Sequence, residues 1–252
     1  MPTHLEIAES AAREAGQLLR DNYGSNLDVD EMAAYDIKLA LDVESQELIS
    51  RILLAAFPDH AIFGEEGIAG EQDSRFQWVV DPIDGTVNYF YGIPHFCISI
   101  ALREDGELKT GVIYDPMLDE LWAVERGGTP TLNGKVIRTS PRTELSDAVV
   151  TIGFSKSKAS LDAGFERFKE ISPKVRKVRI LGSAALAMAY IACGRLDAYI
   201  EEQISLWDIA AGKLLVEAAG GQVNLIPSAT APGKDSICAF NGKVPLGHIF
   251  GE

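Results

Sequence analysis

The chain of 252 residues contains few of the residues that cross-link small folds through disulfides or bind transition metals. It has three cysteines, Cys97, Cys193 and Cys238, and four histidines. The cysteines are widely spaced and form no CxxC pair, which argues against a disulfide framework or a cysteine-ligated zinc site. The histidines show no HxxxH-like spacing either. We therefore expect reduced cysteines in the core and a fold stabilised by hydrophobic burial alone.

Basic residues and long apolar runs are also scarce. Lys and Arg total 23 against 37 Asp and Glu, a formal net charge of −14. Such an acidic surface repels nucleic-acid backbones and anionic membranes, so neither is an expected partner. The longest apolar stretch, residues 184–193, is too short to cross a bilayer. No secretory signal is apparent at the N-terminus. These absences predict a cytoplasmic enzyme.

What is present is the pattern of a mixed α and β protein. Helical spacing of apolar residues predicts helices over about residues 5–24 and 43–57. Short β-rich runs follow, and the second half alternates strands with helices. The expected strands are 78–81, 97–103, 108–115, 120–124, 149–152, 178–181 and 198–201, and the later helices are 161–171, 183–193 and 207–219. The change of rhythm predicts subdomains over residues 1–140 and 141–252.

The most informative segment reads WVVDPIDGTVN over residues 78–88. An apolar strand runs into Asp81, and Pro82 is expected to end its ladder, so that Asp81 and Asp84 lie on one turn. Two carboxylates held this close repel each other unless a divalent cation lies between them. Gly85 leaves room for a phosphate to approach the backbone. A plain acidic turn is the competing interpretation of this segment.

Three further acidic positions support the metal interpretation. Glu65 lies in a Gly-Glu-Glu-Gly turn after an apolar run, Asp208 near the start of an apolar helix, and Asp42 just before the helix expected at residue 43. Each has an ordinary alternative, because a solvated loop accounts for Glu65 and helix capping accounts for Asp42 and Asp208.

Together these segments resemble the inositol monophosphatase family over nearly the whole chain. The resemblance rests on DPIDGT at residues 81–86, GEE at 64–66, GSAA at 182–185 and WD at 207–208 leading into EAAGG at 217–221. It implies a layered αβαβα sandwich, an α+β fold of the sugar phosphatase type, that is usually a homodimer. It also implies hydrolysis of a small phosphorylated polyol or sugar with two or three Mg²⁺ ions, and inhibition by Li⁺.

The resemblance also assigns roles to individual residues. Metal ligands are implied at Glu65, Asp81, Asp84, Asp208 and the main-chain carbonyl of Ile83. Asp42 and Thr86 are implied to orient and deprotonate the attacking water, with Glu65 beside them. The amides of Gly85 and Thr86 are implied to hold phosphate oxygens. Contacts to the alcohol portion are implied for Gly182, Ser183, Ala184 and Glu201, with Ile83, Asp84 and Asp208 also lining the substrate site.

The chain departs from the family pattern at two positions. A family lysine would fall near Glu31 and a family histidine at Ser205. Lys38 is a candidate to supply the missing cation. These departures leave the identity of the alcohol open.

Several functions remain as alternatives. Val87, Asn88 and Tyr89 after the DGT motif are closer to the inositol type than to the histidinol-phosphatase type. Fructose-1,6-bisphosphatase, histidinol-phosphatase and phosphoadenosine-phosphate phosphatase activities are the alternatives within the superfamily. An aspartyl-phosphate mechanism through Asp81 or Asp84 and a regulatory scaffold without turnover are less favoured. Other residues are less favoured as site residues. His95 and the aromatic residues 89–91 are expected to pack against other side chains. A group of basic residues is expected to form a solvated face, and Arg179 is its candidate for binding a second phosphate; the group comprises Lys156, Lys158, Arg176, Lys177 and Arg179.

Overall fold

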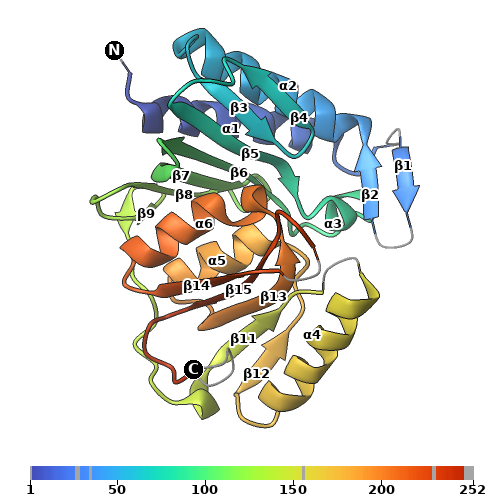
Figure 1. Cartoon of the computed structure of the whole chain (residues 1–252), viewed down its shortest axis with the longest axis vertical. Helices are drawn as coiled ribbons and strands as arrows, with labels where there is room; N and C mark the ends of the chain where they lie inside the picture. Colours follow the sequence, from blue (N-terminus) through green and yellow to red (C-terminus); the bar gives the residue numbers. More distant parts are fainter. Residues whose placement is uncertain (1, 26–28, 34–35, 155–156, 229–230, 247–252) are drawn as a thin grey trace.

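The structure is a computed structural model that describes residues 2–25, 29–33, 36–154, 157–228 and 231–246. Its elements stack as alternating layers of helices and sheets (Figure 1). Two helices cover one face of a large sheet, two helices lie between this sheet and a smaller one, and one helix covers the outer face of the small sheet. This arrangement confirms the layered αβαβα fold expected from the sequence.

The first layer consists of α1 (His4–Asn22) and α2 (Ala40–Ala56). Thr3 caps α1 by accepting a hydrogen bond from the amide of Glu6, whose carboxylate accepts one from the amide of Thr3. The buried face of α1 is made mostly of alanines and Leu19. Small side chains let this helix approach the sheet closely, so the layer is thin and well packed.

The large sheet has eight strands in the order β10-β9-β8-β7-β6-β5-β3-β4. Neighbouring strands are antiparallel except β3 and β5, which run parallel. The short α3 (Thr86–Phe90) follows β5 directly. The strands are β3 (Ala61–Gly64), β4 (Gly67–Gly70), β5 (Phe76–Asp84), β6 (Cys97–Glu104), β7 (Glu107–Asp115), β8 (Glu120–Glu125), β9 (Thr131–Leu132) and β10 (Lys135–Val136).

The second sheet has five strands in the order β12-β11-β13-β15-β14. Its two parallel pairings, β11 with β12 and β11 with β13, use helical crossovers, whereas β13, β15 and β14 are antiparallel neighbours. The strands are β11 (Val149–Ile152), β12 (Lys177–Arg179), β13 (Ala198–Ile204), β14 (Gln222–Pro227) and β15 (Asp235–Phe240). A 3₁₀ turn, η1 (Leu145–Asp147), precedes β11, and a separate hairpin of β1 (Val29–Ala33) and β2 (Asp36–Leu39) precedes α2.

The central helices are α5 (Ala184–Ala192) and α6 (Leu206–Ala218), and α4 (Lys158–Ile171) lies outside the small sheet. Almost every residue of α5 is buried, as expected for a helix covered on both sides. Gly220 follows the C-cap of α6 with φ +93°, the left-handed conformation in which many helices end. The three cysteines are free, as predicted, and two of them are buried.

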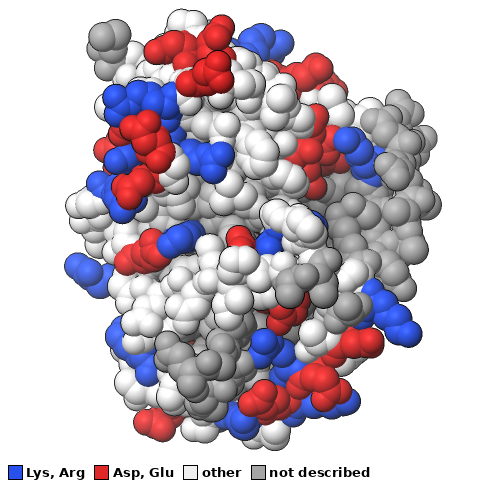
Figure 2. Space-filling view, viewed as in Figure 1, with Lys and Arg blue, Asp and Glu red and all other residues white. Residues whose placement is uncertain are grey.

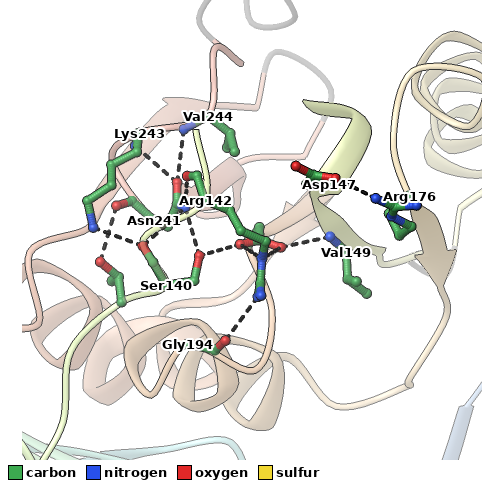
Figure 3. Close-up of polar contacts among 11 residues, drawn as sticks. Ser140, Arg142, Asp147, Val149, Arg176, Gly194, Asn241, Lys243 and Val244 are labelled. Atoms are coloured by element: carbon green, nitrogen blue, oxygen red, sulfur yellow. Dashed lines mark hydrogen bonds and ion pairs between the residues drawn. The ribbon is translucent and has the colours of Figure 1, made fainter. Parts of the chain in front are cut away.

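The buried carboxylate of Asp197 links the segment that joins the two sheets to the second sheet. It accepts hydrogen bonds from the Arg142 guanidinium at 2.8 and 2.9 Å, from the Ser140 hydroxyl and from the Val149 amide at 2.7 Å. Asn241, after β15, donates to the Ser140 hydroxyl at 2.9 Å, and Figure 3 shows these side chains side by side. A charge in the interior is tolerated when it is paired in this way. The division of the chain near residue 140 nevertheless stays a prediction.

The surface carries many exposed ion pairs. On the face shown in Figure 2, acidic and basic side chains of the described residues lie interspersed around the upper and lower parts. Examples of such pairs are Arg75 with Glu104 and Lys169 with Glu166. Exposed pairs contribute about 0–1 kcal/mol each, so the buried layers dominate stability. In the described ranges, no helix is both long and apolar enough to span a membrane.

Most predicted elements are present, with shifted ends. The helix expected at residue 161 begins at Lys158, and the strand expected at 178–181 ends at Arg179. The prediction that the strand at 78–81 ends at Pro82 was wrong, because β5 continues to Asp84. The sequence analysis missed several short strands altogether: β1, β2, β4, β9, β10, β14 and β15.

Candidate active site

The carboxylates singled out in the sequence converge at the C-terminal end of β5. Asp81 and Asp84 are both buried, at 2% and 7% exposure. The pairing of β5 with β6 is irregular between these two residues, which is how the strand accommodates Pro82 without a ladder hydrogen bond from it. The Asp81 carboxylate accepts a hydrogen bond from the Ile83 amide at 3.1 Å. The two carboxylates therefore come from an irregular strand end and not from a free turn.

Asp84 is held by the N-terminus of α5. Its carboxylate accepts hydrogen bonds from the Ser183 hydroxyl at 2.5 Å, the Ala185 amide at 2.7 Å and the Ala184 amide at 3.2 Å. The Cys97 thiol lies 3.6 Å from the same carboxylate. Burial raises the pKa of Asp84, whereas these hydrogen bonds lower it. The N-terminus of α5 thus fixes the orientation of a buried carboxylate.

Asp42 and Thr86 form a contact between two elements. Asp42 is the third residue of α2, not the residue before the helix as predicted. One of its carboxylate oxygens accepts a hydrogen bond from the Leu39 amide at 2.8 Å, so Asp42 does help to cap the helix. The other carboxylate oxygen lies 3.4 Å from the Thr86 hydroxyl. The same hydroxyl donates to the Ile83 carbonyl at 2.9 Å. Burial, together with the charges of Glu66 and Glu65, raises the pKa of Asp42 to about 7.

Asp208 repeats the geometry of Asp42 at the start of α6. It is the third helical residue, and its carboxylate accepts the Ser205 amide at 2.9 Å. Burial, followed by the charge of Asp84, raises its pKa to about 7. Glu65 lies in the turn between β3 and β4, where its amide donates to the Val80 carbonyl of β5 at 3.1 Å. Both residues are therefore placed beside the end of β5.

The electrostatics of Asp81 show how close these groups are. Burial raises the pKa of Asp81 well above its ordinary value, and the charges of four neighbouring carboxylates raise it further, namely Glu65, Asp84, Asp208 and Asp42. Among the described residues, no three acidic, histidine or cysteine side chains form a preassembled metal cage. The donor set is nonetheless hard oxygen around a site of strong negative potential. These residues fit a divalent cation, whose charge would relieve their repulsion.

Lys38, at the end of β2, lies on the rim of this acidic group. Its ammonium forms an ion pair with Glu66, and this contact is the main reason that its pKa is raised; Asp42 and Glu65 contribute as well. The Glu66 amide in turn donates to the Gln46 side chain of α2 at 2.9 Å. Lys38 thus supplies a cation beside the site, as the sequence suggested. Gln46 and Cys97 are contacts that sequence reasoning missed, because no local pattern marks them.

The loop before α5 packs against the turn after β5. Gly85 has φ +99°, and a Cβ atom there would lie 3.1 Å from the His95 carbonyl and 3.2 Å from the Gly182 carbonyl. The Asn88 side chain donates to the His95 and Leu181 carbonyls at 2.8 and 2.9 Å. These contacts hold the start of α3 against the loop before α5, which brings Thr86 and Ser183 to the same region.

The remaining candidates mostly pack or lie at the surface as predicted, but Tyr91 is exposed, so the prediction that the aromatic run packs was wrong for this residue. Tyr89 is buried in the core and donates to the Leu19 carbonyl at 2.8 Å. His95 is half-buried and packs edge-on against Tyr190. Arg176 pairs with Asp147 (Figure 3), and Arg179 is exposed on β12. The Glu31 side chain and Lys156 lie outside the described residues.

Comparison with known proteins agrees with this geometry. The model of the inositol monophosphatase family matches residues 2–240. The chain is 38% identical to the Nus factor SuhB of Xylella fastidiosa over 97% of its own length and 91% of that protein. It is 39% identical to an inositol-1-monophosphatase of Mesorhizobium japonicum over 87% of its length and 84% of that protein.

A solved structure shows the same fold. The inositol monophosphatase of Anabaena superposes with a TM-score of 0.82 at 37% identity, with 95% of this chain and 90% of that chain covered. Members of the family are generally metal-dependent and act on small phosphorylated substrates. Sequence match, fold and the position of the carboxylates all agree, so the chain belongs to the inositol monophosphatase family and is a phosphatase.

Proposed function

We propose that the protein hydrolyses a small polyol or sugar phosphomonoester with Mg²⁺, and that inositol monophosphate is the best candidate substrate. The observation that carries this proposal is the group of carboxylates around the buried Asp81, whose mutual repulsion raises the pKa of that residue. Mg²⁺ prefers oxygen ligands, keeps part of its water shell and accepts phosphate oxygens as further ligands. An acidic site of this kind binds a phosphate ester only with such ions in place.

The proposed metal ligands are Glu65, Asp81, Asp84, Asp208 and the Ile83 carbonyl. Two or three Mg²⁺ ions would neutralise phosphate charge and lower the pKa of a water molecule there. Asp84 is suited to ligation because Ser183 and the α5 amides fix its orientation. The Ile83 carbonyl accepts a hydrogen bond from the Thr86 hydroxyl at 2.9 Å, and a carbonyl oxygen has a second lone pair that can bind a metal ion.

Thr86 and Asp42 are the proposed pair that positions the attacking water and removes its proton. The Thr86 hydroxyl lies 2.9 Å from the Ile83 carbonyl and 3.4 Å from the Asp42 carboxylate. Because it has a single proton, it would turn that proton from Ile83 to Asp42 when it accepts a hydrogen bond from water. A carboxylate whose pKa is about 7 is well matched to proton transfer near neutral pH. The glutamate of the same region, Glu65, is proposed to assist by fixing the water from its other side. The mechanism forms no covalent bond between phosphate and the protein.

The N-terminal ends of α3 and α5 form the proposed substrate site. The amides of Gly85 and Thr86 would hold phosphate oxygens, since amides at a helix start carry partial positive charge. Gly182, Ser183, Ala184 and Glu201 would contact the alcohol portion. Ser205, where the family has a histidine, leaves the choice among inositol phosphate, fructose 1,6-bisphosphate and related substrates to experiment.

Substitution of Thr86 tests the mechanism. In assays of phosphate release from inositol 1-phosphate with Mg²⁺, Thr86→Ala should lose about 100-fold or more in kcat, the range for removal of an acid–base partner. Thr86→Ser keeps the hydroxyl and should retain most of the activity. A Thr86→Ala variant as active as the wild type would contradict the assigned role.

The resemblance also supports a homodimer, a cytoplasmic location and inhibition by Li⁺ as proposals. A second candidate function comes from the 38% identity to a protein named as a Nus factor. In that case the fold would act on a partner without turnover. The retained acidic group favours catalysis, and a binding function would survive loss of the Asp84 charge whereas catalysis would not.

A further inference from the structure

The side chain of Asn88, on α3, joins this helix to two loops. Its amide group donates to the His95 carbonyl at 2.8 Å, in the loop that leads to β6. It also donates to the Leu181 carbonyl at 2.9 Å, in the loop that leads to α5, and lies 3.4 Å from the Gly182 carbonyl. A side-chain amide has two N–H donors, so the two short contacts use both of them. Asn88 thus links its own helix to a segment 93 residues further along the chain.

The start of α5 is held by two side chains at once. The Asp84 carboxylate accepts hydrogen bonds from the Ser183 hydroxyl and from two amides in the first turn of α5. The carbonyls just before these donors face the Asn88 side chain instead. The orientation of this segment that points its donors at Asp84 is therefore the same orientation that offers its carbonyls to Asn88.

Close backbone packing leaves the Asn88 side chain little freedom. A Cβ atom at Gly182, which has φ +76°, would lie 3.1 Å from the Asn88 side-chain nitrogen. The main-chain carbonyl of Asn88 also accepts a hydrogen bond from the Ile93 amide at 2.8 Å, which closes the turn after α3. Asn88 is half-buried, so these hydrogen bonds are partly shielded from water. The side chain is thus fixed in the position that joins the three segments.

The link concerns the site because the residues on either side of Gly85 have roles in the proposed function. Asp84 is a proposed metal ligand, and Thr86 lies on the same short helix as Asn88. Without the Asn88 contacts, the loop before α5 is free to turn its peptide groups, and the Asp84 carboxylate loses the donors that fix its orientation. Removing a partner that orients a metal-binding side chain typically costs about 10–100-fold in metal affinity.

We propose that Asn88 is a positioning residue that sets the orientation of the loop before α5 and, through it, the orientation of the Asp84 carboxylate in the metal site. This inference rests on the proposed function, since it takes Asp84 to be a metal ligand. Asn88 acts through the start of α5, so its loss should weaken Mg²⁺ binding and leave the activity at saturating Mg²⁺ nearly intact. A purely structural role would lower stability and leave the affinity for Mg²⁺ unchanged.

The test measures Mg²⁺ binding to the metal-free protein by isothermal titration calorimetry, for the wild type and Asn88→Ala. The dissociation constant of Mg²⁺ should rise about 10-fold or more in the variant. In assays of phosphate release from inositol 1-phosphate, the Mg²⁺ concentration that gives half-maximal activity should rise by the same factor. The value of kcat at saturating Mg²⁺ should stay close to that of the wild type.

Asn241→Ala is the matched control, because the Asn241 amide group also donates two hydrogen bonds, to the Ser140 hydroxyl and the Arg142 carbonyl at 2.9 Å each, in the network around Asp197. It should lower stability and leave the dissociation constant of Mg²⁺ unchanged.

If Asn88→Ala does not fold, Gly182→Ala disturbs the same contact with a single methyl group and should weaken Mg²⁺ binding in the same way. Wild-type affinity for Mg²⁺ in the folded variant, or an equal loss in Asn241→Ala, overturns this inference alone. A wild-type protein that binds no Mg²⁺ would overturn the proposed function and this inference together.

Discussion

Asp42 should make the metal-free protein less stable as the pH rises. Its carboxyl is 3% exposed, and burial raises its pKa from 3.8 to about 7. The folded protein therefore binds this proton more tightly than the unfolded chain does. The free energy of unfolding therefore falls by about 4 kcal/mol between about pH 4 and pH 7 and then levels off. About 3 kcal/mol of this loss occurs above pH 5.

The Asp42→Asn variant isolates this contribution. The amide oxygen still accepts from Leu39, but the group no longer ionises. In urea unfolding followed by tryptophan fluorescence with chelator present, the variant should gain about 3 kcal/mol relative to the wild type between pH 5 and pH 8. Asp73→Asn, which changes an exposed carboxyl, should show no such gain. A difference between Asp42→Asn and wild type that is the same at both pH values would refute the reasoning.

Three further predictions concern the metal group and the network around Asp197. Asp84→Asn should abolish phosphate release while leaving the circular dichroism spectrum native; retained turnover would show that Asp84 is not a metal ligand. Li⁺ should inhibit release by competing with Mg²⁺, and full activity at high Li⁺ with saturating substrate would exclude this competition. Arg142→Ala should lower the free energy of unfolding by about 2–3 kcal/mol, because it leaves a buried carboxylate short of its charged partner. Arg176→Ala, which breaks the exposed pair with Asp147 in Figure 3, should cost less than about 1 kcal/mol, and equal losses in the two variants would contradict the argument.

The acidic positions were predictable because local sequence places them. Asp81 and Asp84 follow a strongly apolar strand, and Asp208 stands at the start of an apolar helix. Capping accounts for the positions of Asp42 and Asp208, since each accepts the amide just before its helix. The helix at Asp42 nevertheless begins earlier than predicted, because Leu39 and not Asp42 is the capping position.

The missed features depend on partners far away in the sequence. β4 is short, rich in glycine and mostly exposed, so no apolar alternation marks it, and it forms only by pairing with β3. β5 passes Pro82 because an irregularity opposite β6 absorbs that residue. The contact of Cys97 with Asp84, and the space that Gly153 leaves for Glu201, join segments far apart in the chain. No periodicity within one segment predicts such contacts.

Phosphate release from a panel of esters, with Mg²⁺ and with chelator, tests the central claim most directly. The panel holds inositol 1-phosphate, fructose 1,6-bisphosphate, histidinol phosphate, phosphoadenosine phosphate and AMP. The account predicts release that requires Mg²⁺ and is fastest with inositol 1-phosphate. Release that persists in chelator, or no release from any ester by folded protein with Mg²⁺, would contradict it.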